Sequence, residues 1–330
     1  MKESTKVIII AIVMFYLVIS LIAGSFNPAD WFQGGAAPTS QEGVPTGEVP
    51  VGIFNLKTVA YNTLDISSSL TEGTNYGVYW YANRGGGWIL LGSGDDALIE
   101  ATEQDGGFVY AVVEVPSGQS YYVDASETKL KNPRVYAVSY EDPDGDGYKE
   151  FVFKFSLYNV PKPASGNPTV YFYPYFLAYE KPSINSPSDI SGIGTAITTQ
   201  YIEWYLSFSN EKKAFALAKI ELTVNTTDTS KITIQHINIP AVGYLSGDAL
   251  GAPYKGTSTL TWTYTIGNNL MQAAYIKYGQ NMLNKFEFTT EVQTQLQSGD
   301  VLEFTITIYG FTSSGTLTTI TDTVVLSESS

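Results

Sequence analysis

The sequence predicts an all-β protein in which an N-terminal transmembrane helix is followed by two β-sandwich domains. Three observations predict this. One long apolar run stands near the N-terminus, the rest of the chain alternates apolar and polar residues with a period of two, and Gly, Pro, Asn and Asp separate the alternating segments. A chain of 330 residues has room for two folded domains beyond such an anchor.

The apolar run extends from Val7 to Ala23 and is broken only by Ser20. At the rise of an α-helix it covers roughly 26 Å, close to the thickness of the hydrocarbon core of a bilayer. Lys2 and Lys6 precede the run, and the next basic residue is Lys57. The positive-inside rule therefore predicts a cytoplasmic N-terminus and a body on the outer side of a membrane.

A cleaved signal peptide is the alternative, because Ala23, Gly24 and Ser25 give the small-residue pattern of a cleavage site. Both interpretations place the body outside the cytoplasm. We favour a retained single-pass anchor over residues 1–32, with the lipid bilayer as its partner. Residues 33–50, which are rich in Gly and Pro, then form a linker.

The body divides, on its turn signals, into a small β-sandwich over residues 51–130 and a larger one over residues 131–330. Segments such as Phe108–Val115 and Leu302–Ile308 have the composition or the strict alternation of strands. About ten such strands in the larger region fit a sandwich, with the eight-stranded jelly roll as the leading candidate. One stretch, Asn268–Asn284, has helical character.

The composition excludes some functions. The net charge is −14 with 18 scattered basic residues, whereas nucleic-acid binding needs clustered Lys and Arg. The absence of Cys excludes disulfides, zinc–thiolate sites and thiol nucleophiles. Charged residues make up 15% of the chain, so the surface must be largely hydroxyls, amides and tyrosine tips, which suits contact with neighbouring proteins.

The most specific motif is a calcium-type loop. Asp142, Asp144 and Asp146 alternate, a Gly follows them, Tyr148 can offer its carbonyl, and Glu150 stands at the ninth position of the loop. A strand rather than a helix follows, and the twelfth position is not acidic, so the loop resembles those between strands of extracellular β-proteins rather than an EF-hand. The sequence predicts a structural Ca²⁺ that clamps the junction of the two domains. The alternative is an acidic turn without an ion.

Other candidates for chemistry are weaker. His236 is the only histidine, so any Ser-His-Asp triad would have to use it, but no nucleophile motif accompanies it. Asp95 and Asp96 are adjacent, and adjacent carboxylates point apart instead of facing each other across a cleft. We therefore expect no enzymatic activity. An N-glycosylation sequon begins at Asn225.

Aromatic residues occur in strings at Tyr79–Tyr81, Tyr171–Phe176 and Trp204–Tyr205. In a strand, alternation turns half of each string into the core and leaves the other half outside. Core packing is the favoured interpretation of these strings. The outward half would serve protein contacts or form a platform on which sugars stack.

Two resemblances extend these expectations. The turn at Asp105-Gly106-Gly107, the strand after it and the segment 116–123 (PSGQSYYV) resemble prealbumin-like and carboxypeptidase-regulatory-like modules. The low-charge, Tyr- and Thr-rich, cysteine-free body resembles jelly-roll or β-sandwich coat proteins of membrane-containing archaeal viruses and archaeal surface proteins. The second resemblance implies a capsid, penton or turret subunit anchored in the viral membrane, which self-associates or binds other coat proteins. The alternative is a cell-surface or appendage protein that acts as an adhesin or carbohydrate-binding module, with glycans as partners.

Overall fold

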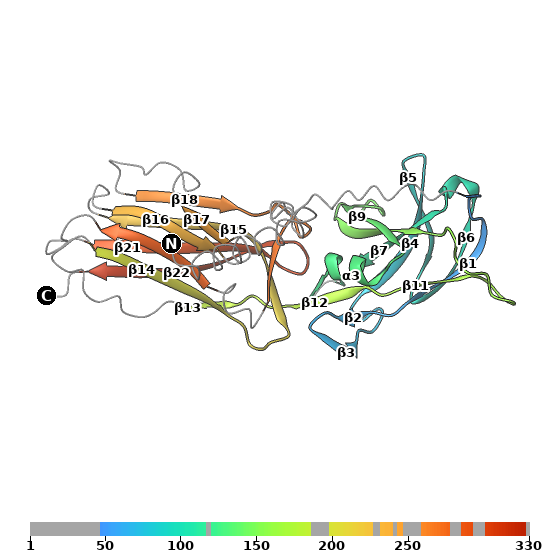
Figure 1. Cartoon of the computed structure of the whole chain (residues 1–330), viewed down its shortest axis with the longest axis horizontal. Coiled ribbons are helices and arrows are strands. Elements are labelled where there is room, and N and C mark those ends of the chain that lie inside the picture. Colours follow the sequence, from blue (N-terminus) through green and yellow to red (C-terminus); the bar gives the residue numbers. More distant parts are fainter. Residues whose placement is uncertain are drawn as a thin grey trace, which may run out of the picture. The chain divides into compact units, whose positions relative to one another are not determined.

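The computed structural model describes most of the body of the chain as β-structure (Figure 1). The predicted all-β class is therefore confirmed. No helix within the described part of the chain is long and apolar enough to cross a membrane. The expected span Val7–Ala23 and all but the end of the linker lie outside the described residues. Those described residues are 47–116, 120–185, 198–226, 232–239, 243–246, 259–277, 285–292 and 301–327.

The first group of sheets consists of a three-stranded and a five-stranded sheet that share one core. The three-stranded sheet has the order β11 (Thr169–Phe172), β1 (Gly52–Thr58), β6 (Asp96–Ala101). The five-stranded sheet is antiparallel, with the order β5 (Gly87–Ser93), β4 (Gly77–Arg84), β7 (Phe108–Glu114), β10 (Glu150–Ser156), β9 (Val135–Glu141).

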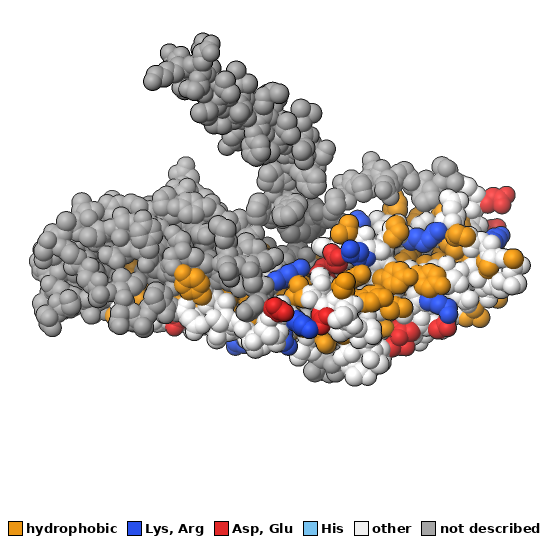
Figure 2. Space-filling model, turned by 60° about the horizontal axis from the view of Figure 1, so that its bottom comes forward, with side chains coloured by type: hydrophobic (Ala, Val, Ile, Leu, Met, Phe, Trp, Pro, Cys, Tyr) orange, Lys and Arg blue, Asp and Glu red, His pale blue; other side chains and the backbone are white. Residues whose placement is uncertain are grey.

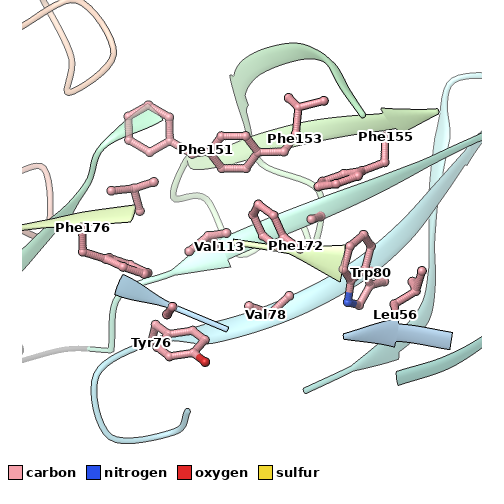
Figure 3. Close-up of a cluster of buried hydrophobic side chains, with 14 of the residues drawn as sticks. Leu56, Tyr76, Val78, Trp80, Val113, Phe151, Phe153, Phe155, Phe172 and Phe176 are labelled. Carbon is pink, nitrogen blue, oxygen red and sulfur yellow. The ribbon is translucent and has the colours of Figure 1, made fainter. Parts of the chain in front are cut away.

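Aromatic rings fill the core of this first group (Figure 3). The Phe172 ring from β11 is fully buried, and its centroid lies 5.8 Å from that of Trp80, 5.5 Å from that of Phe153 and 5.0 Å from that of Phe155. Such edge-to-face and tilted pairs add to the free energy gained from burying the rings. The core is thus formed by the inward half of each alternating strand.

The second group contains a nine-stranded and a five-stranded sheet. The nine-stranded sheet has the main order β22 (Leu317–Ser327), β21 (Val301–Phe311), β15 (Lys213–Thr226), β12 (Tyr175–Tyr179), β2 (Tyr61–Asn62), β3 (Asp65–Ser69). Three further strands pair with members of this order: β18 (Thr259–Thr265), β19 (Ala274–Lys277) and β8 (Tyr121–Val123). The smaller one has the order β13 (Ser183–Asn185), β14 (Thr198–Ser207), β20 (Lys285–Val292), β16 (Ile232–Ile239), β17 (Gly243–Ser246).

The strand β15 belongs to both cores. Ala214 and Ala216 point into the first core, whereas Phe215 and Leu217 point into the second, and all four are fully buried. The register of β15 with β21 shifts just after Leu217, which is the mark of a β-bulge. Beyond the bulge the strand continues into the second core only.

A buried tyrosine joins β8 to the junction of β15 and β21. The Tyr122 hydroxyl donates to the carbonyl oxygen of Phe311 at 2.5 Å and accepts from the backbone N–H of Ala216 at 3.2 Å. Burial raises the pKa of Tyr122, so the phenol keeps its proton and can act as the donor. Its hydroxyl thus satisfies two backbone groups close to the bulge.

The expected division into residues 51–130 and 131–330 does not coincide with the sheets. The short helix α3 (Ala125–Lys131) spans the expected boundary. Beyond it, β10 pairs with β7 and β11 pairs with β1, while β9 joins the same sheet as β10. The described strands of residues 131–330 are therefore divided between both groups of sheets instead of forming one jelly roll.

The expected helix at Asn268–Asn284 is wrong within the described residues. Ala274–Lys277 is strand β19, and it pairs with β15 from Ala214 to Leu217. Pairing with a buried strand outweighs the helical pattern of the local sequence.

Candidate functional site

The predicted calcium loop lies in the hairpin between β9 and β10. Its aspartates hold the loop in shape by accepting backbone hydrogen bonds: Asp142 accepts from Gly145 at 2.7 Å and from Gly147 at 3.0 Å, and Asp146 accepts from Tyr148 at 2.7 Å. Both glycines have positive φ, of 78° and 93°, which a residue without Cβ adopts easily. These hydrogen bonds and the two glycine turns therefore curl the loop around the carboxylates of its own aspartates.

This curl brings the three aspartates together. One carboxylate oxygen from each of Asp142, Asp144 and Asp146 lies within 4.8 Å of the others. Glu150 begins β10, and one of its carboxylate oxygens is buried without a hydrogen-bond partner among the described residues. The Tyr148 side chain is 72% exposed, so only its backbone carbonyl is a candidate ligand.

Two acidic residues that sequence reasoning missed extend the cluster. Glu141 on β9 is directly opposite Glu150, and the register that pairs Phe151 with Val113 continues to place Glu114 of β7 on its other side. Like charges directly opposite each other on neighbouring strands destabilise a sheet. Only the pairing of β7, β10 and β9 reveals these two residues, because the spacing of residues along one strand does not show which strands are its neighbours.

The electrostatics of the cluster follow from this crowding. Burial has the largest effect on the pKa of Glu150, and the charges of Asp144, Asp146, Glu114 and Asp142 follow in that order. Together they raise this pKa to about 8. Burial, then Asp144 and Asp146, also raise the pKa of Glu114. An arrangement of oxygen ligands whose charges repel one another is suited to a hard divalent cation, which would neutralise them.

The position of the loop corrects one expectation. The loop joins two neighbouring strands of a single sheet, β9 and β10, and not the two expected domains. Any ion held there would fasten the end of the five-stranded sheet.

The remaining candidates are placed apart from this cluster. Asp95 accepts a hydrogen bond from the Tyr76 hydroxyl at 2.6 Å, while Asp96 faces Lys57 at 3.4 Å, so the two adjacent carboxylates have different partners. His236 lies in β16, opposite Ser246 and Thr289. That the chain is not an enzyme stays a prediction.

The sequon asparagine is placed on β15. The Asn225 side-chain amide donates to Glu303 at 3.1 Å, across the pair formed by β15 and β21.

The aromatic strings alternate as predicted. Trp80, Phe172, Phe176 and Trp204 are fully buried, and Trp204 also donates its indole N–H to Asp322 at 2.9 Å. Tyr171, next to the buried Phe172, is 52% exposed. The inward half of each string forms core. Of the outward residues, Tyr171 and Tyr205 are exposed, whereas Tyr81 is buried in a small cluster on the other face of its sheet.

The fold and the site together define an all-β protein of the sandwich type with an acidic loop at the end of one sheet. No protein-family model matches the chain, and no curated protein matches it.

Solved structures give distant likenesses. The major pilin subunit of Bacillus cereus is 13% identical, with 84% of this chain and 69% of that chain covered and a TM-score of 0.26. The backbone pilin of serotype M6 Streptococcus pyogenes is 8% identical, with 85% and 64% covered and a TM-score of 0.25. The collagen binding domain of an Erysipelothrix rhusiopathiae surface protein is 11% identical, with 86% of each chain covered and a TM-score of 0.21. These TM-scores are low, so we argue function from the residues of the chain itself.

Proposed function

We propose that the chain is a membrane-tethered cell-surface or appendage protein whose body packs against neighbouring copies or other surface proteins. The observation that supports this is a hydroxyl-rich sheet face on the second group of strands. We call it the threonine face, and it consists of Thr223, Thr261, Thr263, Thr305, Thr307, Thr321 and Thr323.

The threonine face is built by register. Four threonines stand side by side across β18, β15, β21 and β22 and form a first row. A second row, two residues away along each strand, contains three more threonines and Glu221. Thr305 and Thr323 are hydrogen-bonded at 3.0 Å, and Thr321 donates to Thr307 at 3.4 Å. The first row is Thr261, Thr223, Thr305 and Thr323, and the second is Thr263, Glu221, Thr307 and Thr321.

Two properties make this face suitable for packing. Threonine is β-branched and stiff at χ1, so ordering it at an interface costs little side-chain entropy. The charges on the face are largely compensated, because Lys219 lies 3.3 Å from Glu221 and over the ring of Tyr309 at 3.8 Å. A neighbouring protein therefore meets hydroxyls and a ring instead of a field of unpaired charge.

We propose the cell surface instead of a virion, because the capsid interpretation expected a retained anchor followed by one large sandwich over residues 131–330. The described strands of that range are divided between two groups of sheets. Fractionation of the native source tests the setting. Recovery of the chain in the cell envelope supports the proposal, and recovery in virus particles refutes it.

The packing itself is tested by charge insertion. Thr263→Lys together with Thr321→Lys places two cations on exposed positions of the face without touching the core. We expect the full-length chain in detergent to lose its association in analytical ultracentrifugation. Thr74→Lys, at an exposed turn in the first group of sheets, is the matched control and should associate normally. A monomeric unmutated chain, or a double variant that associates like the control, would contradict the proposal.

The acidic loop carries a second proposed function, the binding of a structural Ca²⁺. The supporting observation is that three aspartate oxygens converge beside an unpartnered oxygen of Glu150. Asp142, Asp144, Asp146, Glu150 and the carbonyl of Tyr148 would supply the ligands, and Glu114 and Glu141 would add negative charge.

Calcium binding is tested by melting the full-length chain with and without the ion. A hundredfold excess of Ca²⁺ over its Kd should stabilise the fold by about 2.7 kcal/mol. Asp144→Ala should abolish the shift, whereas Asp96→Ala, which removes an exposed carboxylate elsewhere, should keep it. An unmutated protein whose Tm ignores Ca²⁺ would exclude the site.

A further inference from the structure

We infer that a row of four tyrosines, which runs from β11 past β2 to β12, is a binding site for a neutral oligosaccharide. The row consists of Tyr171, Tyr173, Tyr61 and Tyr175, and we call it the tyrosine row. It does not involve the threonine face or the acidic loop. Figure 2 shows hydrophobic side chains gathered on the face of the molecule that carries the first group of sheets.

The rings follow one another at regular spacing. The centroid of Tyr171 lies 6.2 Å from that of Tyr173, which lies 6.3 Å from that of Tyr61, which lies 5.7 Å from that of Tyr175. The Tyr171 and Tyr173 rings are nearly parallel, at 4°, and the other two steps are tilted by 38° and 30°. The steps are comparable to the length of a sugar ring, so successive tyrosines can meet successive sugars.

The backbone beneath the row is held rigidly. Pro174 interrupts the strand, so the chain between β11 and β12 needs other partners for its polar groups. Asn132, at the end of α3, supplies them: its side chain accepts from the N–H of Tyr173 at 2.9 Å and donates to the carbonyl of Tyr173 at 2.8 Å. Thr128 accepts from the N–H of Tyr175 at 2.9 Å.

These two polar side chains are buried, with Thr128 at 0% and Asn132 at 2% exposure. Buried polar side chains whose hydrogen bonds are satisfied fix the geometry of the backbone to which they bind. On the opposite side, the N–H of Tyr61 donates to the carbonyl of Pro174 at 3.0 Å. The row is therefore pre-organised, which lowers the entropy lost when a ligand binds.

The hydroxyl tips are available to a ligand. Within the described part of the chain, no protein group forms a hydrogen bond with any of the four phenol oxygens. Burial, and then the proximity of the Tyr171, Tyr61 and Tyr175 side chains, raises the pKa of Tyr173. A phenol hydroxyl can both donate and accept a hydrogen bond, so each of the four tyrosines offers a ligand both functions.

The chemistry of this row selects its ligand. A sugar offers a face of C–H groups and a rim of hydroxyls, which match an aromatic ring face and a phenol oxygen. The charged neighbours on the adjoining strands, Lys57 and Asp96, form an ion pair at 3.4 Å. Because no unpaired cation stands beside the row among these neighbours, a neutral oligosaccharide fits better than a sulfated or phosphorylated one.

The experiment measures the affinity of the full-length chain for neutral hexasaccharides of glucose, mannose and N-acetylglucosamine by isothermal titration calorimetry. At least one should bind. Tyr171→Ala should weaken that binding roughly tenfold or more, because it removes the most exposed ring of the row. Tyr171→Phe should weaken it less, since it keeps the ring and removes only the hydroxyl. Tyr205→Ala, which removes a tyrosine on β14 that is 40% exposed, should have no effect.

Several outcomes would overturn the inference. They are failure of every hexasaccharide to bind, equal affinity of Tyr171→Ala and the unmutated chain, or binding only of sulfated sugars. Binding of a proline-rich peptide instead, on the same tyrosines, would assign the row to a protein partner. Sedimentation of Tyr171→Ala keeps this test separate from the proposed function, because self-association should be unchanged.

Discussion

Tyr122→Phe is the sharpest test of how β8 is joined to β15 and β21. The change removes one oxygen and leaves the ring, which is 1% exposed, in place. Two backbone groups lose their partner: the N–H of Ala216 and the carbonyl of Phe311. Each unsatisfied buried group costs about 1–3 kcal/mol, so the free energy of unfolding should fall by about 2 kcal/mol or more.

The assay is thermal or urea unfolding of the full-length chain, followed by circular dichroism. A loss of this size lowers Tm by roughly 2–4 °C per kcal/mol in a large domain. Tyr121→Phe is the matched control, because the neighbouring hydroxyl has no hydrogen bond to another described residue. Equal melting temperatures for the two variants would refute the role given to the Tyr122 hydroxyl.

Three further predictions follow from buried charge and backbone. Without Ca²⁺, Glu150 binds its proton more tightly in the folded state, so stability should fall as pH rises from about 4.5 to about 8; a flat profile that Glu150→Gln does not alter would contradict this. Arg84→Met leaves the Asp105 carboxylate, whose side chain is 0% exposed, without its ion pair and should cost about 3 kcal/mol in urea unfolding; a loss below about 1 kcal/mol would contradict that pairing. Gly107→Ala should destabilise by about 1–3 kcal/mol, because φ is +78° and a Cβ would lie 2.3 Å from the Tyr158 ring; an unchanged Tm would contradict it.

Local sequence patterns predicted the features that depend only on residues close together in the sequence. Alternation placed Trp80 and Phe172 in the core and Tyr171 outside, because the side chains of a strand point to opposite faces whatever its partners are. The spacing of the aspartates likewise predicted their convergence, since the loop closes on itself over a few residues.

Features that depend on strand partners could not be predicted in this way. Glu114 and Glu141 join the acidic cluster only because β7, β10 and β9 are neighbours in one sheet. The same applies to the expected domain boundary, because β10 and β11 pair with strands that precede it in the chain. Strand partners are selected by the packing of whole sheets, and the alternation of a single strand does not encode them.

Helical character at Asn268–Asn284 was misleading for a related reason. The apolar residues that suggest a helix there include Ile276, which is fully buried because β19 lies against β15. A short apolar segment is compatible with either element, and the neighbouring strand decides between them.

The strand β15 has a consequence for a protein without disulfides. Its alanines line one core and its phenylalanine and leucine line the other, so neither core can open without exposing apolar surface of its neighbour. Half-open forms with bare strand edges are the species that proteases cut and that aggregate. Because the two cores share this strand, such forms are costly, and the chain gains an all-or-none resistance of the kind that disulfides provide in other proteins.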